Sequence, residues 1–226
     1  MSKELFDNLT LVASLILLAP LVILFFRFNA LSLIQKKLSF IVILTVLVEI
    51  ISWSLWYKKI NNLPVYHFFT VIQFLLIVNI YRGALSQTFS KKFFTSLSIG
   101  FVVFAIINIV FFQDLLTFNS NATTLMGLII IFLSLSYFYA LLKEVKYSTL
   151  ETNPMFWINS GFLIYFSSSL ILFFMNNTLF KEVTEASLIL WGLHAIINIV
   201  LTIFYIVAIS VKPKKETNEN NDFLIE

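Results

Sequence analysis

Seven apolar stretches, each long enough to cross a lipid bilayer, occupy almost the whole chain. A membrane-spanning helix needs about 20 mostly apolar residues. The sequence predicts such helices at 8–28, 38–57, 63–82, 93–112, 121–143, 155–177 and 186–211. Of the 226 residues, 59% are hydrophobic and 12% are charged, against about 45–50% and about 25% in soluble domains. We therefore expect an all-α polytopic membrane protein, with 1–211 as a single transmembrane domain and 212–226 as a disordered polar tail.

Local sequence signals mark several helix boundaries. Asn61 to Pro64 interrupts the chain between the second and third predicted helices, and Asn153 with Pro154 precedes the sixth. Pro20 lies inside the first predicted helix. Because proline has no N–H and its ring clashes with the preceding turn, we expect a kink there.

The basic residues divide unequally between the two sides of the predicted bundle. One side carries eleven, namely Arg27, Lys36, Lys37, Arg82, Lys91, Lys92, Lys143, Lys146, Lys212, Lys214 and Lys215. The other side carries four, namely Lys3, Lys58, Lys59 and Lys181. Loops on the cytoplasmic side of a membrane protein are enriched in Lys and Arg. The sequence therefore predicts an external N-terminus and a cytoplasmic C-terminus.

Several chemistries lack the residues that they need. The chain has no cysteine and two histidines, so we expect no disulfide, no metal site and no cysteine nucleophile. It has no Gly-x-Ser-x-Gly elbow and no glycine-rich phosphate loop. A net charge of +3 is too small to indicate nucleic-acid binding. We expect no cofactor and no catalytic residue, and an enzyme is the less favoured interpretation.

Polar residues inside the spans carry the functional hypothesis, because ionisable groups are costly in a bilayer. Glu49 is the only acid deep within a predicted span. At about 1.5 Å per residue, Glu49, Gln73, Tyr165 and His194 all lie roughly 15 to 18 Å from the inner membrane edge, and His67 lies near 24 Å. The candidate ligand-binding or proton-sensing residues are Glu49, Trp53, His67, Gln73, Tyr165, His194 and Asn198.

These residues also have a structural interpretation. Polar side chains join membrane helices through hydrogen bonds of about 0.6 kcal/mol each, and Glu49 with His194 could be such a pair. A functional acid–histidine pair would instead respond to protons near neutral pH. His67, near an interface, has the features of a structural histidine. Aromatic residues near helix ends, such as Trp56 and Tyr81, are expected to be interfacial anchors.

Two helices carry a family resemblance. Residues 153–161 (NPMFWINSG) and 163–167 (LIYFS), together with residues 190–198 (LWGLHAIIN) and Tyr205, resemble uncharacterised seven-helix membrane proteins of Bacteroidota that are associated with histidine-kinase signalling. The resemblance implies a bacterial inner-membrane location and a sensory role. This chain contains no kinase domain, so a histidine kinase would be a separate partner beside the lipid bilayer.

Three functions are consistent with these features. The first is a sensory or receptor-like module whose polar intramembrane cluster responds to a ligand or to pH. The second is a small-solute or proton-coupled transporter in which Glu49 titrates. The third is an accessory membrane subunit that binds no ligand and uses its polar residues only for packing.

Overall fold

The computed structural model of the chain describes residues 1–143, 150–179 and 185–212; the predicted tail lies almost entirely outside these residues. All regular secondary structure within them is helical. The helices are α1 (Lys3–Ile16), α2 (Leu18–Arg27), α3 (Leu33–Tyr57), α4 (Leu63–Ala84), α5 (Lys91–Phe111), α6 (Ser120–Lys143), α7 (Pro154–Leu179) and α8 (Glu185–Ser210). Because α1 and α2 form one span, seven helices are long and apolar enough to cross a membrane. The prediction of an all-α protein with seven apolar helices of membrane-spanning length is thus confirmed.

Two boundaries differ from the predicted ones for identifiable reasons. The chain forms a helix from Lys3, because the Ser2 hydroxyl accepts the N–H of Leu5 and so satisfies a free donor of the first turn. α3 begins at Leu33 rather than at residue 38. There the Gln35 side chain accepts the Ser32 N–H at 2.9 Å, as in a capping box.

The first span is broken where Pro20 was expected to kink it. α1 ends at Ile16 and α2 begins at Leu18. Pro20 cannot donate a hydrogen bond to the carbonyl of Ile16, four residues earlier. α1 and α2 nevertheless count together as one candidate span, Lys3–Ala30.

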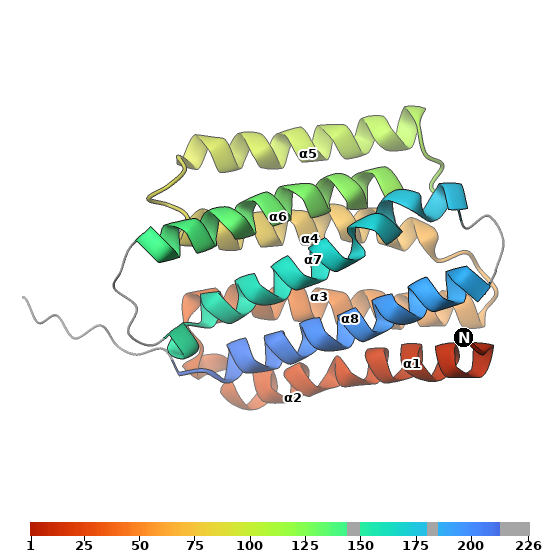
Figure 1. Cartoon of the computed structure of the whole chain (residues 1–226), viewed down its shortest axis with the longest axis horizontal. Helices are drawn as coiled ribbons and strands as arrows, with labels where there is room; N and C mark the ends of the chain where they lie inside the picture. Colours follow the sequence, from red (N-terminus) through yellow and green to blue (C-terminus); the bar gives the residue numbers. More distant parts are fainter. Residues whose placement is uncertain (144–149, 180–184, 213–226) are drawn as a thin grey trace, which may run out of the picture.

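The helices run side by side along the long axis of the molecule (Figure 1). α7 packs between α6 and α8, while α3 packs on α4, and α4 in turn contacts α6. α5 is peripheral and contacts α4 and α6, and α1 packs mainly on α8. We call the end of the bundle that holds Met1 the N-terminal end, and the opposite end, where α8 finishes, the C-terminal end (Figure 1).

Aromatic rings and one glycine hold the helices close together. Phe74 of α4 stacks on Phe101 of α5 with ring centroids 3.8 Å apart, and both rings are buried. Gly161 of α7 faces Phe204 of α8. A Cβ atom at Gly161 would lie 2.8 Å from the Phe204 Cβ, so the absence of a side chain permits this close helix approach.

A buried polar network joins three helices toward the C-terminal end. The Tyr81 hydroxyl of α4 lies 2.7 Å from the Ser134 hydroxyl of α6 and donates to the Asn159 Oδ1 of α7 at 2.7 Å. Asn159 also donates to the Ser134 carbonyl at 3.2 Å. All three side chains have no exposed surface. The expectation that Tyr81 is an interfacial anchor was therefore wrong, because its hydroxyl finds partners inside the bundle.

The C-terminal end of α8 is held by side chains from the first two spans. The Gln35 amide donates to the carbonyls of Ala208 and Val211, each at 2.8 Å. Arg27, at the end of α2, donates to the Ser210 carbonyl at 2.8 Å. The last carbonyls of a helix lack partners within the helix and carry partial negative charge. These donors therefore stabilise the end of α8 and connect it to α2 and α3.

Candidate intramembrane binding site

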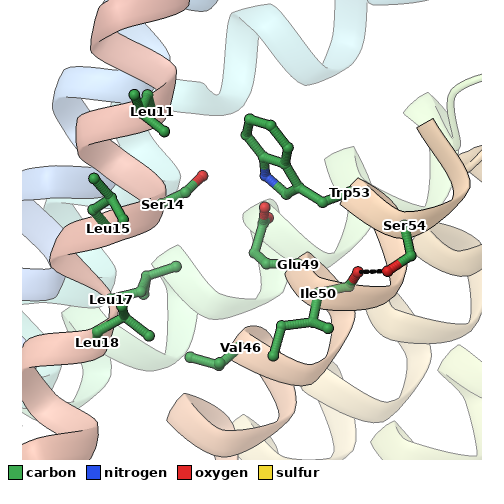
Figure 2. A pocket seen from close by; sticks show the side chains of 10 residues that line it. All are labelled: Leu11, Ser14, Leu15, Leu17, Leu18, Val46, Glu49, Ile50, Trp53 and Ser54. Carbon is green, nitrogen blue, oxygen red and sulfur yellow. Dashed lines mark hydrogen bonds between the residues drawn. The ribbon is translucent and has the colours of Figure 1, made fainter. Parts of the chain in front are cut away.

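Glu49 lies in a crevice at the side of the bundle, between the first span and α3 (Figure 2). The crevice has a volume of about 370 Å³. Its walls are Leu11, Ser14, Leu15, Leu17 and Leu18 from the first span, and Val46, Glu49, Ile50, Trp53 and Ser54 from α3. Most of these side chains are apolar, so the crevice matches a hydrocarbon chain better than an aqueous solute.

The crevice exists because α1 does not follow α3. α1 packs on α8 and α3 packs on α4, whereas α2 contacts both α3 and α8. The walls remain accessible from outside the bundle: Leu15 is 55% exposed and Ile50 is 58% exposed. In a membrane these side chains face lipid, so a molecule dissolved in the bilayer can reach the crevice laterally.

Three polar groups point into this apolar space. The Glu49 carboxyl and the Trp53 indole project from α3, and the Ser14 hydroxyl projects from α1 on the opposite wall (Figure 2). Among residues 1–143, 150–179 and 185–212, none of the three has a hydrogen-bond partner. Unpaired polar groups are costly away from water. The three side chains are therefore available to form hydrogen bonds with a bound molecule. The Glu49 carboxyl is also available to bind a positively charged group.

Behind Glu49, toward the interior, lie two tyrosines. Tyr66 of α4 and Tyr165 of α7 both interact electrostatically with the Glu49 carboxyl. The Tyr66 hydroxyl is 2.9 Å from the Ser52 hydroxyl, whereas the Tyr165 hydroxyl has no hydrogen bond to any described residue. Glu49 thus stands at the junction between the crevice and the interior of the bundle.

His194 belongs to an adjacent group rather than to a direct pair with Glu49. Its Nδ1 lies 2.9 Å from the Ser169 hydroxyl, and its ring centroid is 5.6 Å from that of Tyr165. Asn198 donates to the His194 backbone carbonyl at 3.0 Å and so bonds within its own helix. Tyr165 therefore lies between Glu49 and His194. The polar partners of His194 are Ser169 of α7 and Asn198 of α8, and neither lines the crevice.

The two remaining predicted residues lie apart from the crevice. His67 is buried, and its Nε2 is 2.9 Å from the Thr117 carbonyl, so it fastens the segment between α5 and α6 to α4. Gln73 is half-buried and has no hydrogen bond to a described residue. Within the described ranges, no three His, Asp or Glu side chains gather as metal ligands would.

The structure adds one residue that the sequence reasoning did not select. Ser14 forms the polar part of the crevice wall opposite Glu49. The available signal was its isolation, since it is the only polar residue between Leu11 and Phe26. Its significance depends on the position of α1 relative to α3, which the sequence does not specify.

Comparison of the chain with protein families, with curated proteins and with solved structures found no match. The candidate function is therefore argued from the geometry of the crevice.

Proposed function

We propose that the protein is a receptor-like membrane module that binds an amphipathic ligand from the lipid phase, with Glu49 receiving the ligand's head group. The observation that carries this proposal is the Glu49 carboxyl, which has no hydrogen-bond partner among the described residues and lines a laterally accessible crevice with apolar walls. Ionisable groups inside membranes are rare and usually functional.

The lining of the crevice indicates the ligand's chemistry. A carboxylate attracts a cation or a strong hydrogen-bond donor, and Ser14 offers a second polar contact across the crevice. Leu11, Leu15 and Leu18 form an apolar wall along the first span. A volume of about 370 Å³ is near the lower end of small-molecule sites, which span about 300–1,000 Å³. A long-chain amine has the required features.

The packing of the first span offers a route for signalling. A ligand wedged between α1 and α3 would press on α1, and α1 packs against α8. At the C-terminal end, Arg27 connects α2 to the last turn of α8 through the Ser210 carbonyl. Movement of the first span would therefore reach the end of α8, where a separate partner such as a membrane-bound histidine kinase could respond.

This role requires a defined orientation in the bacterial inner membrane, with the N-terminus outside and the C-terminus in the cytoplasm. The eleven-to-four division of basic residues supports it. The chain has no native cysteine, so single cysteines report sidedness directly. We expect a membrane-impermeant maleimide to label Lys59→Cys in intact spheroplasts and Lys91→Cys only after lysis. The reverse pattern would invert the topology.

Ligand binding can be measured through Trp53, which lines the crevice. Protein in bicelles is titrated with a brominated long-chain amine, and tryptophan quenching is recorded. We expect quenching that Trp53→Phe greatly reduces and that Trp157→Phe, in α7, preserves. A brominated fatty acid of equal length should quench less, because its carboxylate repels Glu49.

Glu49 is tested by a matched pair of variants. Glu49→Gln keeps the shape of the side chain and removes its charge, so we expect the amine to bind about tenfold more weakly, as for loss of a charge-assisted hydrogen bond. Glu4→Gln makes the same change at an exposed position of α1 and should leave binding unchanged. If amine and fatty acid quench equally, and Glu49→Gln changes neither, the proposal fails.

Transmission is tested separately from binding. Spin labels on cysteines at Val12 of α1 and Ile51 of α3, both exposed, report the width of the crevice by pulsed electron paramagnetic resonance. We expect the amine to lengthen this distance in the parent protein and to leave it unchanged in Glu49→Gln. If the amine binds and the distance between the two labels does not change, the receptor mechanism is refuted and only the binding site is supported.

The transporter alternative has less support in the packing. Toward the C-terminal end from Glu49, the interior of α4, α6 and α7 is closed by the fully buried Tyr81, Ser134 and Asn159. A solute path through the interior of these three helices would have to break this network. Amine-dependent proton flux in proteoliposomes, lost in Glu49→Gln, would favour the transporter over the receptor.

A further inference from the structure

A second pocket lies at the C-terminal end of the bundle, far along α3 from Glu49. Its volume is about 310 Å³. It is lined by Leu33, Ile34 and Lys37 of α3, Ile80, Gly83 and Ala84 of α4, Tyr137 of α6, and Asn153 and Met155 at the start of α7. Four helices therefore contribute to it, and its lining includes an ammonium, an amide and a phenol.

Lys37 is the charged group of this pocket. Its ammonium donates to the Asn79 backbone carbonyl at 2.7 Å and lies 3.3 Å from the Asn79 side-chain oxygen. A Cβ atom on Gly83 would be 3.7 Å from the same ammonium nitrogen. The ammonium is thus held over an exposed stretch of α4 backbone, where the absence of a side chain on Gly83 leaves space beside it.

No acid in the described part of the chain forms an ion pair with Lys37. Among the described residues, the charged side chain that interacts with Lys37 is another cation, Arg82, which precedes the lining residue Gly83 in the last turn of α4. At this end of the bundle, the only acid among the described residues is Glu151, and within those residues it forms no ion pair with either cation. Two neighbouring cations beside a pocket repel each other unless an anion lies between them.

We propose that this pocket binds a phosphate-bearing anion, with Lys37 and Arg82 as its cationic ligands. Basic pockets between transmembrane helices favour anionic head groups. The Asn153 amide donates to the Tyr137 hydroxyl, so two further polar groups stand on the pocket wall. The phosphate is the shared chemistry of two sources, an anionic phospholipid and free inorganic phosphate.

The surroundings of the pocket favour the phospholipid. Leu33 is 74% exposed, and Ile34 and Ile80 line the same pocket. Lys37 is one turn inside α3, about 6 Å from its first residue, and thus near one end of a helix long enough to span the membrane, where lipid head groups are expected. The head group would meet the cations while the acyl chains follow the apolar side chains of α3 and α4.

The test is native mass spectrometry of the purified full chain in detergent, titrated with phosphatidylglycerol, with phosphatidylcholine, or with inorganic phosphate alone. We expect phosphatidylglycerol to bind more tightly than phosphatidylcholine. Lys37→Gln and Arg82→Gln should each weaken that binding about fivefold, from the usual contribution of one basic residue to anionic-lipid binding. Lys91→Gln, an exposed residue at the start of α5, removes one charge at the same end and should have no effect.

A variant that retains both cations tests the pocket independently, in case the charge variants misfold. Gly83→Leu should fill the space beside the Lys37 ammonium and abolish selective binding of phosphatidylglycerol. If inorganic phosphate binds and displaces the lipid, the site is a phosphate site whose source is not restricted to lipid. The proposal is overturned if phosphatidylglycerol binds no better than phosphatidylcholine and phosphate does not bind. It is equally overturned if Lys91→Gln weakens binding as much as Lys37→Gln does.

Discussion

Replacing Tyr81 with phenylalanine removes one oxygen atom from the centre of the buried network. The hydroxyl makes two contacts of 2.7 Å, one with Ser134 of α6 and one with Asn159 of α7. Interhelical hydrogen bonds in membrane proteins contribute about 0.6 kcal/mol on average and about 1.7 kcal/mol at most. Two such bonds predict a loss of about 1.2 kcal/mol, with an upper bound near 3.4 kcal/mol.

The expected value lies between these limits because the two partners differ. Ser134 can return its hydroxyl to a carbonyl of its own helix, as Ser136 does to Phe132 at 2.8 Å. Asn159 Oδ1 has no such choice and would remain buried without a donor. An unsatisfied buried acceptor costs about 1–3 kcal/mol. We therefore expect Tyr81→Phe to lower the free energy of unfolding by about 1–2 kcal/mol.

The measurement is equilibrium unfolding in mixed micelles of increasing SDS content, followed by circular dichroism. The control is Tyr139→Phe on α6, because Tyr139 is 68% exposed and its hydroxyl has no described hydrogen bond. That variant should leave stability unchanged. A double-mutant cycle of Tyr81→Phe with Ser134→Ala should give a positive coupling energy. If Tyr81→Phe costs no more than Tyr139→Phe, the network does not stabilise the bundle and the reasoning is refuted.

Two further predictions concern helix contacts. Gly161→Ala places a Cβ atom 2.8 Å from that of Phe204, and in thermal unfolding it should destabilise the bundle by about 1–3 kcal/mol. The control is Gly100→Ala, whose new Cβ atom would have nothing within 4 Å. That variant should be neutral or slightly stabilising. Gln35→Leu removes the amide that donates to the carbonyl of Val211. This variant should speed amide hydrogen exchange in the last turn of α8 about tenfold. Unchanged exchange in that turn would contradict the capping role of Gln35.

The spans were predictable because they depend on composition alone. A run of about 20 apolar residues has one stable form in a bilayer. The break near Pro20 was equally predictable, since it follows from the covalent structure of proline. The start of α3 was not predicted, because it depends on a side-chain cap formed by Ser32 and Gln35. A search for apolar residues does not detect polar caps of this kind.

The orientation of each helix was much harder to predict. α6 and α7 carry apolar residues on all sides, so no face of either is marked as the inner one. Tyr81 therefore had the sequence features of an interfacial anchor and yet is buried. Residue counting predicted that Glu49 and Tyr165 lie at a similar level, and in the structure the two side chains interact electrostatically. The crevice itself depends on α1 packing against α8, which residue counting cannot reveal.

That pairing of the first helix with the last has a consequence for biosynthesis. α1 is synthesised well before its main partner α8, which lies more than 150 residues later in the chain. At about 5–20 residues per second, roughly ten to thirty seconds separate Ile16 from Glu185. During this interval α1 remains without α8, with the wall that carries Ser14 open to lipid or to the insertion machinery. Closure of the bundle, and with it the shape of the Glu49 crevice, therefore has to wait until α8 has been made.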